Sequence, residues 1–175
     1  MSQAKKVFTR MCLNNWGGID HKVLEFHEYV NLFSGKSGSG KSTVMDAIQV
    51  ILYGSFSPSF LNKAADDAKN RRSVLSYLRG EQKDGSANRK DCDFCSVIAL
   101  EIEDTGTHII TCIGIAFEVR KSDSEIKKFV YFSHSGKMPE SEYLTEQGVC
   151  YSNQEIKKLV SARTKSDDNR GKGDR

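Results

Sequence analysis

The sequence predicts an α/β fold in which an antiparallel β layer lies beside a glycine-rich loop and its helix. Three observations carry this prediction. Strand-like runs at residues 7–13 and 22–27 come before the loop. The loop itself lies between a short apolar run and an amphipathic segment. Three further strand-like runs come after that segment and are typical of an antiparallel meander.

The first part of the chain predicts a hairpin followed by a separate strand. Residues 7–13 are expected to form one strand, residues 14–18 a turn, and residues 22–27 the second strand. Residues 29–33, with the sequence Tyr-Val-Asn-Leu-Phe, are a short and mostly apolar run before the loop. We expect this run to be the buried strand that leads into the loop.

The glycine-rich loop fits the pattern G-x-x-x-x-G-K-[ST], which binds nucleotide phosphates through its backbone N–H groups. The predicted phosphate-binding residues are Gly35, Lys36, Ser37, Gly38, Ser39, Gly40, Lys41, Ser42 and Thr43. Lys41 is expected to reach the β- and γ-phosphates, and the Ser42 hydroxyl to bind Mg²⁺. A flexible Gly/Ser linker is the alternative, but such linkers do not usually join a buried strand to an amphipathic helix. The sequence therefore predicts a site for ATP and Mg²⁺.

The helix after the loop is predicted from the apolar spacing over residues 44–52, with Gly54 as its end. Residues 63–79 are expected to be helical in parts. The meander is expected at residues 95–103, 108–119 and 128–133, with a turn at 104–107. Residues 140–144 and 153–160 are predicted as short helices. The predicted domain spans residues 1–160, and residues 161–175 are expected to be a disordered polar tail.

Composition excludes several classes of function. The 175-residue chain has a net charge of +3, which is too small to indicate nucleic-acid binding without further evidence. Its five cysteines include one Cys92-x-x-Cys95 pair, and a zinc site would need two more ligands at matching spacing. No apolar run approaches the roughly 20 residues that cross a bilayer. We therefore expect a reduced, cytoplasmic protein without a membrane contact.

The parts needed for ATP hydrolysis are not visible in the sequence. Hydrolysis needs an acidic residue after a buried strand to hold Mg²⁺, and Glu101 is the best candidate. Glu101, Glu103 and Asp104 alternate with Ile102, which favours a half-exposed strand and argues against that role. A signature segment of the L-S-G-G type is also missing. The chain by itself is expected to bind ATP without efficient turnover.

Two stretches carry a resemblance to a known family. The stretch from Asn14-Asn15-Trp16-Gly17-Gly18 to Asp46-Ala47-Ile48 resembles the N-terminal ATPase head segment of SMC, RecF and RecN-type proteins, which have an ATP-binding-cassette type of core. The segment Arg71-Arg72-Ser73-Val74-Leu75-Ser76-Tyr77-Leu78-Arg79-Gly80 is similar to one in MukB-like condensin ATPases of the JetC type, from Wadjet anti-plasmid systems. The resemblance covers residues 7–133.

The resemblance implies an incomplete head, in which this chain is the N-terminal lobe. A C-terminal lobe would supply the Mg²⁺-binding acid, a second SMC-like head would complete the ATP sites, and kleisin-type subunits and DNA would join the full complex. It implies that Arg10, Asn14 and Trp16 lie near the adenine, with Trp16 either stacked on the base or packed in a turn. Gln147 and Gln154 are both candidates for the glutamine that senses Mg²⁺.

Other interpretations stay open at the sequence level. Arg71, Arg72 and Arg79 either contact DNA phosphates or form a solvated helix face. The whole chain could also be a stand-alone P-loop kinase for a small molecule, or a non-catalytic nucleotide-binding module. The chain is further expected to be a truncated product or an isolated lobe that exposes apolar surface.

Overall fold

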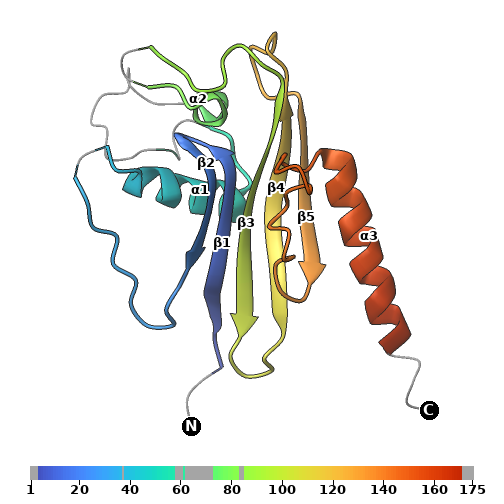
Figure 1. The fold of residues 1–175 in the computed structure, drawn as a ribbon. Helices are drawn as coiled ribbons and strands as arrows, with labels where there is room; N and C mark the ends of the chain where they lie inside the picture. The colour runs from blue at the N-terminus through green and yellow to red at the C-terminus, as the bar shows by residue number, and fades with distance from the viewer. Residues whose placement is uncertain (1–3, 37, 58–60, 62–72, 83–84, 171–175) are drawn as a thin grey trace.

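A five-stranded antiparallel sheet forms the centre of the computed structural model (Figure 1). The structure describes residues 4–36, 38–57, 61, 73–82 and 85–170. The sheet order is β2-β1-β3-β4-β5, and it joins the predicted hairpin to the predicted meander, which are both confirmed. The elements are β1 (Lys6–Trp16), β2 (Ile19–Glu25), α1 (Lys41–Tyr53), α2 (Val74–Arg79), β3 (Phe94–Asp104), β4 (Ile110–Val119), β5 (Lys128–Ser135) and α3 (Asn153–Arg170).

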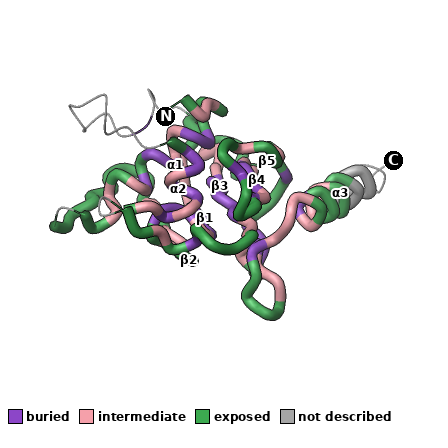
Figure 2. Tube along the Cα trace, turned by 90° about the horizontal axis from the view of Figure 1, so that it is seen from above, coloured by how far each residue is buried: buried purple, intermediate pink, exposed green. Residues whose placement is uncertain are grey.

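Apolar side chains form one cluster on each face of the sheet, because successive residues of a strand point to opposite faces. In β3, Ile98 and Leu100 belong to the cluster that includes α1 and α2. Val97 and Ala99 belong to the other cluster, which includes Ile156 of α3. Figure 2 looks along the strands and shows α1 and α2 on one side of the sheet and α3 on the other. Within the described residues, no helix is long and apolar enough to span a bilayer.

Helix α1 begins and ends where the sequence predicts. Gly40 precedes its first residue with φ 89°, and Gly54 follows its last residue with φ 61°. Glycine reaches this left-handed region without a steric penalty, and the Gly54 N–H donates to the Val50 carbonyl at 3.0 Å. The apolar side of the helix packs on the sheet through Val44, Ala47, Val50 and Ile51.

The strand expected at residues 29–33 is not formed, and this prediction is wrong for the structure. The Asn31 amide bridges the backbone N–H and C=O of His27, at 2.7 Å each, which makes a local turn. Tyr29, Val30 and Leu32 are 74%, 75% and 88% exposed. A strand needs a neighbour to satisfy its backbone, and none of the described strands pairs with this run.

Strand β3 is buried on both faces, which corrects the half-exposed strand expected around Glu101. It lies in the middle of the sheet between β1 and β4, and Glu101 is only 3% exposed. The Glu101 carboxylate accepts hydrogen bonds from the Thr9 hydroxyl at 2.8 Å and the Met138 N–H at 2.6 Å. These bonds explain how a charged residue is accommodated at a buried position.

Several boundaries differ from the predicted ones, and one predicted helix is not formed. Strand β1 continues to Trp16 through the expected turn, because Trp16 pairs with Ile19 of β2. Residues 140–144 are not helical, because Glu142 and Tyr143 have positive φ angles of 51° and 61°. Helix α3 runs to residue 170, although a disordered tail is predicted from residue 161. Arg163 anchors this extension by donating to the carbonyls of Ser135 and Lys137.

Candidate functional site: the phosphate loop and its support

The phosphate loop wraps around the ammonium group of Lys41. The Lys41 Nζ donates to the carbonyls of Gly35 at 2.7 Å and Lys36 at 2.9 Å, and to the Ser39 hydroxyl at 3.2 Å. The predicted role of Lys41 requires this cation to be inside the loop, where phosphate oxygens would also lie. Ser37, a predicted phosphate-binding residue, lies outside the described residues.

Two features of the loop backbone explain its glycines. Gly38 and Gly40 have φ angles of 83° and 89°, a region that other residues rarely adopt. At Gly35, with φ 153°, an added Cβ would lie only 2.6 Å from the Ser39 hydroxyl oxygen, so that hydroxyl would have to move. The loop conformation therefore depends on glycine at these positions.

The N-terminus of α1 is suited to bind an anion. Gly40 provides no side-chain cap, and the first turn of α1 contains no acidic residue. The first N–H groups of a helix have no partner within the helix, and they form the positive end of its dipole. Ser42 is exposed on this turn, next to Lys41, where its hydroxyl is available to a Mg²⁺ bound with a nucleotide.

Thr43 connects the phosphate loop to the β1–β2 turn. Its carbonyl accepts a hydrogen bond from the Trp16 indole at 2.9 Å. A Cβ added at Gly17 would lie 2.5 Å from the Thr43 methyl group, so the hairpin turn is in close contact with the first turn of α1. Thr43 therefore links the loop to the hairpin turn through its carbonyl and methyl group, and the phosphate contact that the motif predicts for it stays a prediction.

Trp16 is a core residue in the structure, in place of the adenine-stacking role suggested for it. The side chain is 0% exposed, and its indole stacks on the Tyr77 ring at 5.1 Å with an interplanar angle of 7°. A base could stack on Trp16 only if it displaced Tyr77. The packed-turn alternative describes the observed position.

The role of Arg10 and Asn14 near the adenine stays a prediction, but the structure shows where both side chains lie. Both side chains point to the face of the sheet opposite α1, where Arg10 binds the Glu142 carboxylate at 3.2 Å. The Asn14 amide donates to the Glu142 carbonyl at 2.8 Å, and Asn14 is fully buried. The structure thus brings neither residue to the phosphate loop.

The predicted DNA-contacting arginines are placed only in part. Arg71 and Arg72 lie outside the described residues. The Arg79 guanidinium donates to the carbonyls of Lys121 and Asp123 in the β4–β5 connection. Arg79 is half-buried and already has these partners, which favours a structural role for it over a phosphate contact.

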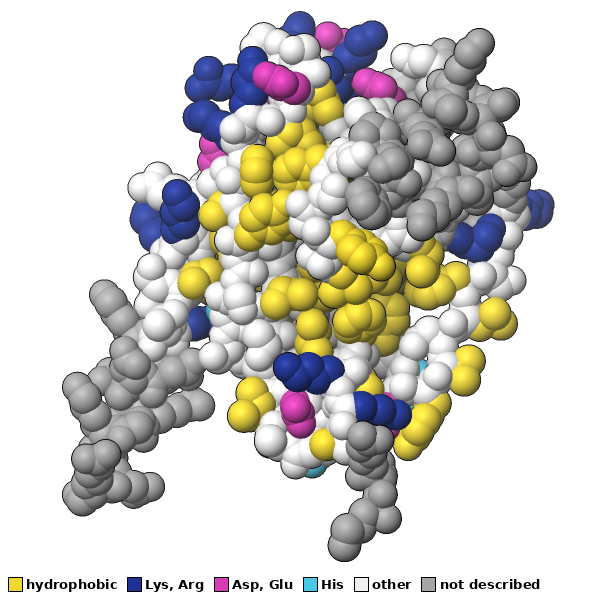
Figure 3. Space-filling model, turned by 180° about the vertical axis from the view of Figure 1, so that it is seen from behind, with side chains coloured by type: hydrophobic (Ala, Val, Ile, Leu, Met, Phe, Trp, Pro, Cys, Tyr) yellow, Lys and Arg dark blue, Asp and Glu magenta, His cyan; other side chains and the backbone are white. Residues whose placement is uncertain are grey.

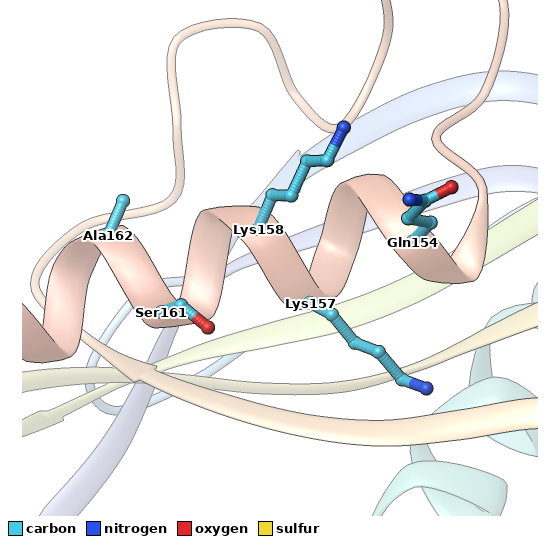
Figure 4. A pocket seen from close by; sticks show the side chains of 5 residues that line it. All are labelled: Gln154, Lys157, Lys158, Ser161 and Ala162. Atoms are coloured by element: carbon cyan, nitrogen blue, oxygen red, sulfur yellow. The ribbon is translucent and has the colours of Figure 1, made fainter.

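The acidic residue that follows Ser42 by one turn of α1, Asp46, is buried and accepts a hydrogen bond from the Tyr77 hydroxyl. Glu101 lies on the face of the sheet opposite α1, where it binds the Met138 N–H, and the described residues contain no cluster of three metal-ligating side chains. Gln154 lies at the start of α3 beside a shallow depression of about 450 Å³, which is lined by α3 alone (Figure 4). Gln147 is exposed in the turn before α3.

Residues to which the sequence assigned no role at the site complete the support of the loop. Asp46 is 3% exposed and accepts a hydrogen bond from the Tyr77 hydroxyl. Arg89 donates to the carbonyls of Leu78 at 2.9 Å and of Gly17, and pairs with Asp20 at 2.8 Å. The motif containing Asp46 and the segment containing Tyr77 were both visible in the sequence, but no sequence signal showed that they meet.

The cysteines give a prediction about thiol reactivity. Burial raises the pKa of the Cys12 and Cys112 thiols to about 12 and that of Cys95 to about 11, whereas Cys92 is exposed. Thiols with raised pKa values stay protonated and react slowly. Brief iodoacetamide treatment of the folded chain is therefore expected to modify Cys92 first, as measured by peptide mass spectrometry. Early modification of Cys112 would contradict the buried position of β4.

Comparisons with known proteins agree with the nucleotide-binding geometry. Residues 8–68 match the family model described as the P-loop containing region of AAA domain. Over 74 residues the chain is 39% identical to SbcC, a subunit of the nuclease SbcCD from Staphylococcus haemolyticus (strain JCSC1435). This match covers 40% of the chain and 6% of the curated relative, so the chain spans a small part of that protein's length. The chain thus contains a P-loop region, which implies nucleotide binding, and is related to this nuclease component over part of its length.

Proposed function

We propose that the chain is the ATP-binding N-terminal lobe of an SMC-like, DNA-processing ATPase. The observation that carries this proposal is the phosphate loop, in which Lys41 is held within 2.7 Å of the Gly35 carbonyl at the uncapped N-terminus of α1. The partial similarity to a nuclease component supports a DNA-processing role over a small-molecule kinase. The narrower condensin and anti-plasmid assignment stays a prediction.

Exposed apolar side chains support the need for a partner lobe. Figure 3 shows hydrophobic side chains gathered on the face behind the view of Figure 1. The exposed apolar residues include members of α1, β5 and the run after β2: Met45, Leu52, Tyr53, Phe129, Tyr131, Tyr29, Val30 and Leu32. Apolar surface near a binding site commonly marks an interface. We infer that a C-terminal lobe covers it and offers residues 29–33 the strand neighbour they lack.

We infer that ATP is hydrolysed only by the complete head, in which a second lobe joins this chain. The acid that follows Ser42 on α1, Asp46, is buried and bonded to Tyr77, and the described residues contain no cluster of three metal-ligating side chains, whereas a phosphoryl-transfer site needs an acid for its Mg²⁺. A second lobe would bring this acid, and a second head would complete the ATP site. DNA and kleisin-type subunits would then be contacted through the full complex.

The experiment is calorimetric titration of the purified chain with ATP in the presence of Mg²⁺, together with a steady-state assay of phosphate release. We expect ATP binding by the wild-type chain, at least about tenfold weaker binding by Lys41→Ala, and no turnover by either. The reason is that the ammonium group of Lys41 lies inside the loop, and that the described residues contain no cluster of three metal-ligating side chains.

Each other outcome has a defined meaning. Wild-type affinity in a folded Lys41→Ala variant would contradict the proposed site. Turnover that depends on Lys41 would show that the chain holds its own metal acid and is not a partial head. Transfer of phosphate to a small acceptor would favour the kinase alternative.

A further inference from the structure

A continuous set of contacts lies behind the phosphate loop, on the side of α1 that faces the sheet. It runs from Asp46 of α1 to Tyr77 of α2, from Tyr77 to Trp16 of β1, and from Trp16 back to Thr43 of α1. Thr43 and Asp46 are three residues apart, so they lie on one side of the helix. The set therefore holds the first two turns of α1 at two points.

Tyr77 makes the central contacts of this set. Its ring stacks on Trp16 at 5.1 Å, and its hydroxyl donates to the Asp46 carboxylate. Its backbone carbonyl accepts from the Gly17 N–H at 2.8 Å. Tyr77 is 2% exposed, so all of these contacts are screened from water. Hydrogen bonds in such a setting are electrostatically stronger than hydrogen bonds in water.

Helix α2 is itself fixed to the rest of the chain, so it can serve as a rigid support. The Ser73 hydroxyl caps its start by accepting from the Ser76 N–H at 3.1 Å. Arg89 binds the Leu78 carbonyl at 2.9 Å near its end and also pairs with Asp20. Arg79 links the same helix to the β4–β5 connection through the Asp123 carbonyl. Because α2 is fixed to the sheet in this way, a side chain of α2 that binds α1 also fixes the position of α1 relative to the sheet.

We propose that Tyr77 is a positioning residue for nucleotide binding. By holding Asp46, its hydroxyl keeps the N-terminal turns of α1 in the orientation in which Lys41 and the loop N–H groups converge on a phosphate. This inference rests on the proposed ATP-binding function. It adds that α2, a segment outside the phosphate-loop motif, controls the affinity of that site.

Trp16 provides a direct readout, because it is the only tryptophan of the chain. Its indole donates to the carbonyl of Thr43, two residues after Lys41, while its ring lies against Tyr77. A nucleotide phosphate that binds Lys41 would shift this same turn of α1, because Lys41 and Thr43 both belong to it. ATP binding is therefore expected to change the fluorescence of Trp16, although the nucleotide does not touch the indole.

The test compares Tyr77→Phe with Tyr131→Phe. Tyr131 gives a matched control, because its hydroxyl donates to the Gly54 carbonyl at 2.7 Å at the opposite end of α1. We would measure ATP affinity by calorimetry, thermal unfolding, and Trp16 emission with and without ATP. Tyr77→Phe is expected to weaken ATP binding about tenfold, or about 1.4 kcal/mol, at a temperature where it is folded. Tyr131→Phe is expected to stay within about twofold of the wild-type affinity.

The outcomes separate this inference from the proposed function. Absence of ATP binding by the wild-type chain, or binding unaffected by Lys41→Ala, would overturn the proposed function and this inference with it. Wild-type affinity in folded Tyr77→Phe would overturn only the positioning role, even if its melting temperature falls. If Tyr77→Phe does not fold, the wild-type emission decides: calorimetric ATP binding without a change in Trp16 fluorescence would contradict the coupling.

Discussion

Trp16→Ala is expected to lower the free energy of unfolding by about 4 kcal/mol. The indole is completely buried, and its removal would leave a cavity between α1, α2 and β1. The variant would also lose the stacking on Tyr77 and the hydrogen bond to the Thr43 carbonyl. Urea denaturation followed by circular dichroism measures this loss, since the variant has no tryptophan fluorescence.

Two further variants serve as comparisons for Trp16→Ala. Trp16→Phe keeps an aromatic ring against Tyr77 and is expected to cost roughly half as much, because it still loses volume and the indole donor. Leu32→Ala removes an apolar side chain that is 88% exposed, and it should change stability by less than about 0.5 kcal/mol. A loss below about 1 kcal/mol for Trp16→Ala would contradict the buried position and reopen a ligand-facing role.

Gly114→Ala is expected to destabilise the sheet by about 3 kcal/mol. A Cβ at this position of β4 would lie 2.5 Å from the Phe132 ring and 2.6 Å from the Ile98 carbonyl. The ring could rotate or shift, but the carbonyl belongs to the neighbouring strand β3 and moves only with the sheet. The same denaturation measurement on the folded variant reports the effect.

Gly18→Ala is the control for this substitution. A methyl group added at Gly18 would have no atom within 4 Å, and the residue is exposed in the β1–β2 turn. The expected effect lies within about 0.5 kcal/mol, because alanine adds no clash and slightly reduces the freedom of the unfolded chain. Equal stabilities of the Gly114→Ala and Gly18→Ala variants would contradict the close packing of β4 against β5.

The elements that the sequence predicts well are those whose signal is local. The glycines at 38 and 40 and the residues that follow predict both the phosphate loop and the start of α1. The alternating runs of β3 and β4 predict their strands, and the turn at residues 104–107 predicts that they pair. These features depend on backbone freedom, helical spacing and short turns, which a single stretch of chain specifies.

The failed predictions concern neighbours that are distant in sequence. Residues 29–33 have the composition of a buried strand, but their apolar side chains are exposed because no described strand pairs with them. Glu101 lies in an alternating charge pattern and is nevertheless buried, since Thr9 and Met138 supply its hydrogen bonds from other elements. Composition cannot show which partners a residue will find.

The sequence alone therefore determines that the chain carries a phosphate-binding loop, because G-x-x-x-x-G-K-[ST] specifies the loop backbone, the lysine and the helix start within one short stretch. Only the tertiary structure shows which side chains support that loop on the side that faces the sheet. Trp16, Asp46 and Tyr77 come from three separate elements, and only the packing of α1 and α2 on one face of the sheet brings them together. The same packing places Arg10, Asn14 and Glu101 on the opposite face, because side chains alternate along a strand and a β-sheet separates its two faces.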